Sequence, residues 1–577
     1  MLQESMAKIR FQPRRSLQLD DTRACGETIG IVSKDSVADL GNILLQNTLV
    51  GPLATFIPTA ETLLLGNIKY DLRAVKVCYS CEQAFEDYAG FDFLNDAEGY
   101  GSFLSYCDPS VYGADATHSA LAFVPLIDGV PVSGTVRSFL YSHILQTGAE
   151  GAPSQLWPRN FESLFGLPTP EFIAFMIDFI ESLMTASTGV VAILPDELGY
   201  GESLATHNRT AAVKAEFGMQ AGAVSCLAAI DYLQGTTNGC TRLDSVVTVA
   251  GSSQGGYLAV PMAVALERMG NRVLHVFSGA AFMDAEIQFK HAIDSFLTNA
   301  ISADLDNVVL AFGLAFAAFV SSVETPGLAN TGTGQVLLND AFRDPTDIST
   351  DLIEWYASPD PLSFSESSAL IPIPATSVLV DDMVELFFAA LQGNISSPCT
   401  SDLVVQGTTD KLCEILTTET LFDKLPLVEF PVTLCHSPGD TVNPPLHFPP
   451  SLFEGNRFVN EATSILNGLI DVTGDHFAAI ITCKILPVSF FTVPSQNDTD
   501  LPNLIVALGD EDQARCAPFV AGTGSDAPSL SPTLTGNDAN IPSALPTVVQ
   551  DSSSGIAHVG FLSNMVICMG LFGWHLL

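Results

Sequence analysis

Short apolar runs alternate with longer helical stretches between about residues 70 and 300. The runs rich in β-branched residues, which we predict to be strands, are residues 74–79, 120–126, 135–142, 189–194, 245–250 and 272–278. Apolar residues at helical spacing predict helices over 170–186 and 210–233. Strands that are apolar on both faces and are separated by helices indicate an α/β fold, with a mostly parallel central sheet flanked by helices.

This alternation stops near residue 281 and resumes with the strand-like run 430–435. Between them lie helical stretches joined by loops rich in Gly and Pro: residues 287–300, 308–323 and 378–391. We therefore predict a largely helical lid inserted over 281–425. Residues 308–320 carry no charge but are too few to span a bilayer comfortably, so they form either a buried helix or an apolar surface that meets a lipid-like substrate.

The composition changes again after the second part of this pattern. A segment rich in Ser, Thr, Pro, Gly and Ala has the character of a flexible stalk, and an apolar stretch follows it. The predicted organisation is a poorly ordered N-terminal segment 1–40, the first part of the α/β core 41–280, the lid 281–425, the second part of the core 426–517, the stalk 518–555 and the hydrophobic tail 556–577.

The charge balance excludes one class of partner. The 577 residues include 64 Asp and Glu against 23 Lys and Arg, a formal net charge of −41. Such a surface repels phosphate backbones, so we expect no nucleic-acid binding. Because 47% of the residues are hydrophobic and only 15% are charged, the chain can bury a large core and is not a disordered acidic polymer.

The twelve cysteines are scattered along the chain. Cys78 and Cys81 form the one C-x-x-C, and no second pair completes a zinc pattern, so disulfides in an oxidising compartment are the favoured interpretation. Three N-x-S/T sequons, at Asn208, Asn394 and Asn497, are predicted glycosylation sites that agree with this compartment.

The two ends of the chain carry different targeting signals. Residues 1–17 hold four Lys and Arg residues but no apolar stretch, so no signal peptide is visible. At the other end, small residues before the apolar tail resemble a GPI-attachment signal, with Ser552, Ser553 and Ser554 as candidate attachment sites. A C-terminal membrane helix or a merely adhesive tail is the alternative. We expect an extracellular or cell-surface protein, attached to the membrane through this tail.

The strongest chemical motif is G-x-S-x-G at Gly251, Ser253 and Gly255, between an apolar strand-like run and an apolar helical run. In a tight strand-to-helix turn the residues two before and two after the nucleophile must lack bulk, and both glycines meet that requirement. The turn lifts the Ser253 hydroxyl clear of the sheet. The N–H groups at the start of the following helix then point at a developing oxyanion. Ser252 lacks this glycine spacing.

A serine hydroxyl is a weak nucleophile, so it needs a base and a carboxylate that orients the base. In the strand–turn–helix arrangement these follow in the order Ser, acid, His. Asp440 lies in a Gly-Asp loop after the run 430–435, and His476 lies in a later loop with a glycine. The other histidines precede Asp440, stand too near it or lie beyond the stalk. Asp471 and Asp475 are weaker alternatives for the acid.

At four motifs the chain resembles the α/β-hydrolase superfamily, above all secretory lipases and prolyl-oligopeptidase-like serine esterases. These are the turn 196–203, similar to D-x-x-G-x-G-x-S, the elbow 251–256, the acid loop 435–444 and the G-x-H base loop 474–476. By this resemblance Asp196 is a structural loop residue. The acid loop departs from the family pattern at Ser437, where the family has glycine, and at Asn443, where it has valine.

The resemblance also implies an oxyanion hole. The backbone N–H of Gln254 is one expected donor. The family places a His-Gly pair after its third strand to supply the second, but here His143 is followed by Ile144. The second donor is then Ile144 or Leu145, and the loss of one donor would cost about 3 kcal/mol of transition-state stabilisation.

We therefore predict a serine hydrolase that cleaves carboxylic esters through a Ser253–Asp440–His476 triad and an acyl-enzyme. The expected substrate is a small-molecule or lipid-like ester, and no metal or cofactor is implied. A secreted peptidase of prolyl-oligopeptidase type is one alternative, which the lack of a propeller-like repeat before the core disfavours. The other is a catalytically silent α/β-hydrolase-fold protein that binds partners at a surface.

Overall fold

The computed structural model of the chain describes a sheet, helices around it and part of the insertion. The described residues are 23–48, 65–80, 83–84, 117–144, 152–157, 169–197, 200–205, 215–288, 290, 381–382, 385–386, 389, 398–406, 409–421, 428–437, 439–440, 442–443, 468–471, 476–492 and 505–520. The three sequons, the stalk, the tail with Ser552, Ser553 and Ser554, and most of the predicted lid, including 308–320, lie outside them.

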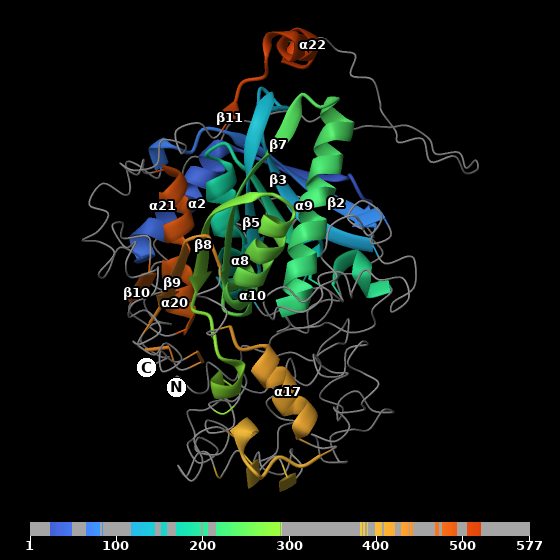
Figure 1. The fold of residues 1–577 in the computed structure, drawn as a ribbon. Coiled ribbons are helices and arrows are strands. Elements are labelled where there is room, and N and C mark those ends of the chain that lie inside the picture. The colour runs from blue at the N-terminus through green and yellow to red at the C-terminus, as the bar shows by residue number, and fades with distance from the viewer. Residues whose placement is uncertain are drawn as a thin grey trace.

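One 11-stranded sheet forms the centre of the protein (Figure 1). Its order is β1-β2-β3-β6-β5-β7-β8-β9-β10, with β4 paired to β3 and β11 paired to β5. The strands are β1 (Thr28–Val32), β2 (Asp71–Ser80), β3 (Thr117–Ile127), β4 (Val130–Pro131), β5 (Gly134–Ser142), β6 (Val191–Pro195), β7 (Thr241–Ser252), β8 (Arg272–Gly279), β9 (Val432–His436), β10 (Gly468–Asp471) and β11 (Ile505–Val506).

The sheet has a parallel part and an antiparallel part. Strands β6, β5, β7, β8, β9 and β10 run parallel to one another. The pairs β1–β2, β2–β3, β3–β6 and β5–β11 are antiparallel. The direction reverses after β3 at the two-residue turn Asp128-Gly129, where both residues have positive φ, as in the tight turns that join hairpin strands. The predicted mostly parallel sheet is confirmed.

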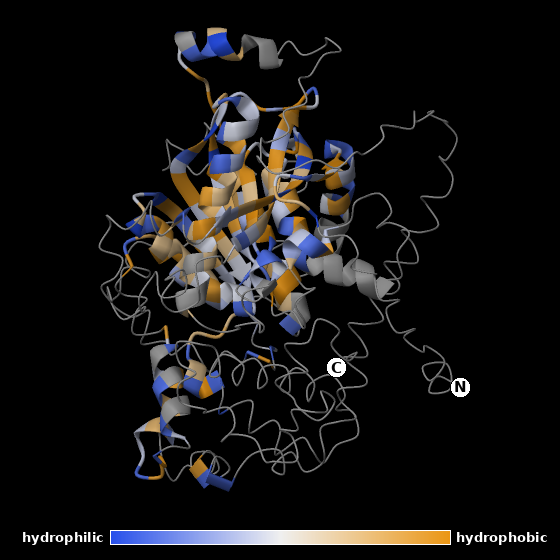
Figure 2. Ribbon diagram, turned by 90° about the vertical axis from the view of Figure 1, so that its right-hand side faces the viewer, coloured by the Kyte–Doolittle hydropathy of each residue, from blue (hydrophilic) through white to orange (hydrophobic). Residues whose placement is uncertain are grey.

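Helices cover both faces of the sheet. They are α2 (Lys34–Thr48), α7 (Pro153–Leu156), α8 (Thr169–Ala186), α9 (Ala215–Thr237), α10 (Gln254–Arg268), α20 (His476–Cys483) and α21 (Ile485–Thr492). The other described helical segments are η3 (Gly201–Ala205), η7 (Pro398–Thr400), α17 (Asp410–Thr418) and α22 (Asp510–Val520). In Figure 2 the strands between the helices are the most hydrophobic part of the ribbon. No helix among the described residues is long and apolar enough to cross a membrane.

Alternate side chains of β3 show why its run is apolar throughout. Ala120 and Ala122 pack in the cluster that contains α9 and α10, whereas Leu121 and Phe123 pack in the cluster that contains α2, α8, α20 and α21. Because successive side chains of a strand point to opposite faces, a strand covered on both sides must be apolar at every position.

The N-terminal segment differs from the prediction that residues 1–40 are poorly ordered. Within it, β1 pairs with β2, and α2 begins at Lys34. A disulfide between Cys25 and Cys78 holds this region to the sheet. The strand was missed because it has only five residues, with a glycine at its centre, and so gives a weak strand signal.

Three more disulfides join distant or local segments of the described chain. Cys435–Cys483 connects β9 to α20, Cys240–Cys516 connects the start of β7 to α22, and Cys399–Cys413 connects η7 to α17 in the insertion. Cys226 in α9 is a buried free thiol. Four disulfides among the described residues are typical of a protein that folds in an oxidising, extracellular compartment. The bond from Cys78 to Cys25 also leaves its C-x-x-C without the paired thiols of a redox motif.

Candidate active site

Ser253 occupies a strained position between β7 and α10. Its backbone has φ 55° and ψ −123°, a region that residues with a side chain rarely adopt. Both flanking glycines are required by close backbone contacts. A Cβ atom on Gly251 would collide with the carbonyl of Gly255, and one on Gly255 would collide with the carbonyl oxygens of Ser142 and His143. The structure therefore has the tight turn that the motif predicted.

The C-terminal end of β8 lies between the serine and the predicted acid loop. The Gly279 carbonyl accepts a hydrogen bond of 2.8 Å from the Ser253 N–H. The Ala280 N–H donates to the Cys435 carbonyl at 2.7 Å, and the Ala280 carbonyl accepts from the Asn443 side chain at 2.7 Å. Strand β8 thus positions the turn at Ser253 relative to the loop that follows β9.

Asp440 is buried in this loop and is held at both carboxylate oxygens. Its Oδ1 accepts from the N–H groups of Val442 at 2.9 Å and Asn443 at 2.8 Å. The Ser437 carbonyl accepts from the Asp440 N–H at 3.0 Å, and the Ser437 hydroxyl accepts from the N–H of Gly439 at 3.1 Å. Ser437 and Asn443, the two departures from the family pattern, therefore both form hydrogen bonds that shape the loop around the carboxylate.

His476 is the first residue of α20, and its ring lies between Asp440 and Ser253. Its Nδ1 is 2.7 Å from Asp440 Oδ2, and its Nε2 is 3.0 Å from Ser253 Oγ. Because a carboxylate can only accept, Nδ1 carries the proton and Nε2 accepts from the serine hydroxyl. The structure thus brings the three predicted residues together in one hydrogen-bonded chain. The alternative Asp471 lies in β10, paired with His436, and Asp475 lies outside the described residues.

The two predicted oxyanion segments lie side by side. Gln254 is the first residue of α10 and is buried, so its N–H belongs to a helix N-terminus. The end of β5 presses against this turn through the contact of Ser142 and His143 with Gly255. Ile144 follows, half-buried, and its carbonyl lies 2.6 Å from His143 Nδ1. Residue 145, the other candidate donor, lies outside the described residues.

Asp196 and Glu197 follow β6 and are both buried. Asp196 accepts from the Ser119 hydroxyl at 2.5 Å, from the Ser154 N–H at 2.9 Å and from the Ser154 hydroxyl, which fits the structural role that the resemblance implies. Glu197 Oε2 accepts from the Gln254 side chain at 2.7 Å. The sequence analysis missed Glu197, because a glutamate beside a motif aspartate carries no signal of a tertiary contact.

A second buried group lies beneath the elbow and was also missed. The Lys484 amine donates to the Tyr141 hydroxyl and lies 3.4 Å from Glu181 Oε2. Burial raises the pKa of Glu181 to about 7, although the lysine opposes this. Burial, with Glu181 and Asp178 nearby, also raises the pKa of Tyr141, whereas a hydrogen bond with Ser252 lowers it. A single lysine within the apolar run 479–491 is the signal that could have revealed this group.

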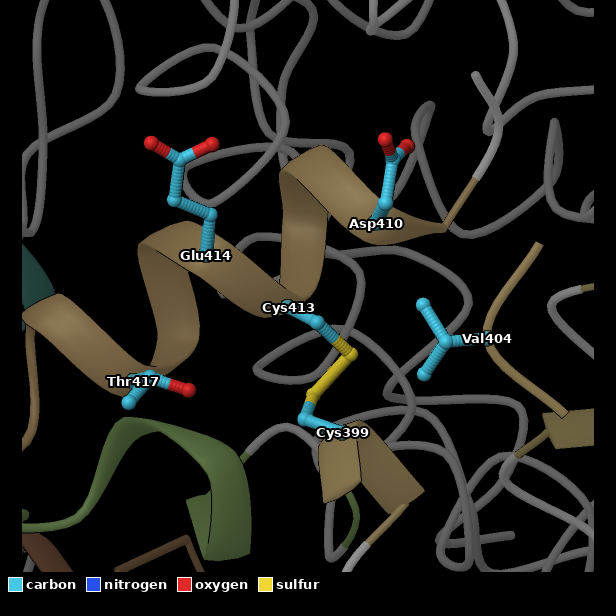
Figure 3. Close-up of a pocket in the computed structure, with 6 residues that line it drawn as sticks. All are labelled: Cys399, Val404, Asp410, Cys413, Glu414 and Thr417. Carbon is cyan, nitrogen blue, oxygen red and sulfur yellow. A yellow bond between two sulfur atoms is a disulfide. The ribbon is translucent and has the colours of Figure 1, made fainter. Parts of the chain in front are cut away.

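The described part of the insertion holds a pocket of about 400 Å³, lined by Cys399, Val404, Asp410, Cys413, Glu414 and Thr417. Figure 3 shows the Cys399–Cys413 disulfide in it, with Asp410 and Glu414 both on α17. Neither Ser253 nor His476 lines this pocket, so it is separate from the hydrogen-bonded chain. Among the described residues, no group of three His, Cys, Asp or Glu side chains could hold a metal ion.

Comparison with known proteins supports the fold. No family model and no curated protein matches the sequence. Among solved structures, the chain is similar to a protein from Legionella pneumophila subsp. pneumophila assigned as a hydrolase, with a TM-score of 0.52 and 16% identity over 82% of this chain and 98% of that one. It is also similar to a mutant of the rice cell wall degrading esterase LipA from Xanthomonas oryzae, with a TM-score of 0.50 and 14% identity over 81% and 98% of the two chains. Together with the strand order and the elbow, this likeness shows that the chain has the α/β-hydrolase fold.

Proposed function

We propose that the protein is a serine hydrolase that cleaves carboxylic ester bonds through Ser253, His476 and Asp440. The observation that carries this proposal is the hydrogen-bonded chain from Ser253 Oγ through the imidazole to the carboxylate, at 3.0 Å and 2.7 Å. Both distances are within the reach that nucleophile, base and orienting acid require. The strained backbone of Ser253 is a second support, because such strain concentrates at functional sites.

In the proposed reaction, Ser253 Oγ attacks the acyl carbon of the ester while His476 Nε2 takes the hydroxyl proton. Asp440 stabilises the imidazolium that forms. The tetrahedral intermediate carries its negative charge on the former carbonyl oxygen, and the Gln254 N–H is a donor for it. His476 then gives its proton to the leaving alcohol as the C–O bond breaks. Water, activated by the same imidazole, hydrolyses the acyl-enzyme to the carboxylic acid and free serine.

We propose a small-molecule or lipid-like ester as the substrate. The support is the apolar composition of the insertion and the similarity to an esterase. Turnover of peptide amides in place of esters would favour the peptidase alternative.

The test is covalent labelling with a fluorophosphonate probe together with hydrolysis of short-chain and long-chain p-nitrophenyl esters. We expect labelling and turnover by the wild type, and loss of both in Ser253→Ala, because the attacking oxygen is gone. Ser252→Ala is the matched control and keeps both, since its hydroxyl lies one residue before the turn. A folded wild type that neither labels nor hydrolyses any ester would contradict the proposal and favour the silent binding protein.

We also propose that the protein is glycosylated at Asn208, Asn394 and Asn497 and anchored to a cell surface through its C-terminal tail. The disulfides support the extracellular compartment. A mobility shift on treatment with an N-glycosidase tests the first claim, and release from cells by a phosphatidylinositol-specific phospholipase tests the second. A protein that shows neither response is not modified in these ways.

A further inference from the structure

Glu197 is a buried carboxylate that the proposed mechanism does not use. Its neighbour Asp196 has hydrogen bonds to both oxygens from Ser119 and Ser154, which explains its burial. Glu197 is only 2% exposed and points to another part of the molecule. An ionised carboxylate at such a depth is costly unless its charge is compensated, so its surroundings must supply that compensation.

The surroundings of Glu197 are the two sides of the predicted oxyanion hole. On the α10 side, the Gln254 side chain donates to Oε2 at 2.7 Å. On the β5 side, the Ser142 hydroxyl donates to Oε1 at 3.2 Å, and His143 Nε2 lies 3.8 Å from the same oxygen. One carboxylate therefore contacts both the residue whose N–H is the expected donor and the segment that faces it.

The hydrogen bond at the other ring nitrogen fixes where the first proton of His143 lies. The Ile144 carbonyl, 2.6 Å from Nδ1, can only accept, so Nδ1 carries a proton. Nε2 is buried and has no hydrogen-bond partner. If the ring is neutral and Glu197 is ionised, a nitrogen lone pair faces a carboxylate in a buried site. One additional proton, on either group, turns this repulsion into attraction.

The chemistry around the carboxylate agrees with such a proton. Among the described residues, the Glu197 carboxylate contacts Ser142 and His143 from the end of β5 and Gln254 from α10. Tyr200 packs edge-on against the His143 ring, with 5.6 Å between the ring centroids. Burial raises the pKa of Glu197, and the histidine and the two hydrogen bonds only partly offset this. A carboxylate in this setting holds a proton to a higher pH than it would in water.

We propose that Glu197 is a positioning residue of the oxyanion hole and that it works with a proton shared between its carboxyl group and His143. On one side of the hole, Glu197 accepts a hydrogen bond from the Gln254 side chain. On the other side it lies beside the His143 ring, whose Nδ1 binds the Ile144 carbonyl. The shared proton removes the negative charge that would otherwise oppose the oxyanion. This inference rests on the proposed ester hydrolysis at Ser253.

The test compares the pH dependence of kcat for p-nitrophenyl butyrate in the full chain and three variants. In the wild type, kcat declines with rising pH as the shared proton is lost. Glu197→Gln has nearly the same shape as glutamate and cannot become negative, so this variant loses that decline. Glu197→Ala and His143→Ala lower kcat about tenfold or more with little change in KM, since the hole acts on the transition state.

Glu419→Gln is the matched control for the isosteric change. Glu419 is also buried, but it accepts from the Ala215 N–H at 2.8 Å and the Tyr257 hydroxyl at 2.5 Å, away from His143. Its variant should keep the wild-type decline of kcat with rising pH. The inference is overturned if Glu197→Gln shows the same decline as the wild type, or if Glu197→Ala keeps the wild-type kcat. A wild type without labelling or turnover would instead refute the proposed function, and this inference with it.

Discussion

Two histidine–carboxylate pairs lie near the turn that carries Ser253, and they are built differently. His476 and Asp440 are 2.7 Å apart, and the far nitrogen of that ring reaches the serine. His143 and Glu197 are 3.8 Å apart, and the nitrogen between them has no hydrogen-bond partner. Every polar side-chain atom of the first pair forms a hydrogen bond. In the second pair His143 Nε2 forms none, so the pair can take up one more proton.

The supports of the two pairs differ as well. The segments that carry Asp440 and His476 are joined covalently by Cys435–Cys483, and Gly279 packs against the second of these cysteines. The other pair is held by noncovalent contacts among β5, α10 and the loop after β6. The comparison teaches that a short, fully bonded pair has one defined tautomer, whereas the looser buried pair leaves a ring nitrogen without a hydrogen bond beside a carboxylate.

The largest expected effect comes from breaking the first pair. Asp440→Asn replaces a pure acceptor by an amide, favours the wrong tautomer of His476 and should lower kcat by roughly 10⁴. Asp471→Asn, at the alternative acid, should leave kcat near the wild-type value. Ester hydrolysis by both variants decides between them, and a larger loss in Asp471→Asn would show that the acid is assigned to the wrong residue.

Removing the covalent support should have the next largest effect. The double variant Cys435→Ala with Cys483→Ala should lose about 2–5 kcal/mol of unfolding free energy and also kcat, because the bridge joins the acid and base segments. The matched double variant of Cys399 and Cys413 should lose stability without the same loss of kcat. Urea unfolding and ester hydrolysis at a temperature where all variants are folded measure both quantities. An unchanged kcat in the first variant would mean that the bridge only stabilises the fold.

The smallest expected effect is at Asn443. Asn443→Ala removes the bond to the Ala280 carbonyl, which should cost about 1 kcal/mol of stability and lower kcat severalfold by loosening the Asp440 loop. Asn271→Ala removes a similar amide-to-carbonyl bond, to Leu266 at the far end of α10, and should lose stability alone. Equal kcat values in the two variants would show that Asn443 does not support the acid.

The sequence predicted those parts of the fold that depend on local pattern. Strands covered on both faces are continuous apolar runs, so β3, β5, β7 and β8 were found close to their observed bounds. Strand β1 has only five residues, with a glycine at its centre, so its signal was weak. The antiparallel direction of β2 and β3 was also not predictable, because hydrophobic periodicity carries no direction. The Asp128-Gly129 turn marks only the reversal between β3 and β4.

The candidate site could be predicted only where a local pattern marks it. Ser253 stands in a motif whose glycines have a local steric cause, and Asp440 and His476 follow from the order of such sites along the chain. Glu197 and Lys484 depend on contacts with residues 57 and 303 positions away, respectively, which no local pattern encodes. Asn443 departs from the family motif. Its hydrogen bond to the Ala280 carbonyl could not be predicted, because only the folded chain brings the two residues together.

The disulfide between Cys240 and Cys516 has a consequence for how the protein could be presented at a surface. It fixes α22, which ends at residue 520, to the start of β7, while Ser253 follows the other end of the same strand (Figure 1). Twelve residues of strand separate the two ends by roughly 35–40 Å. A tether that continues from residue 520 would therefore start from the end of β7 that is far from Ser253, so that the proposed nucleophile would face away from the attachment surface and toward the surrounding medium.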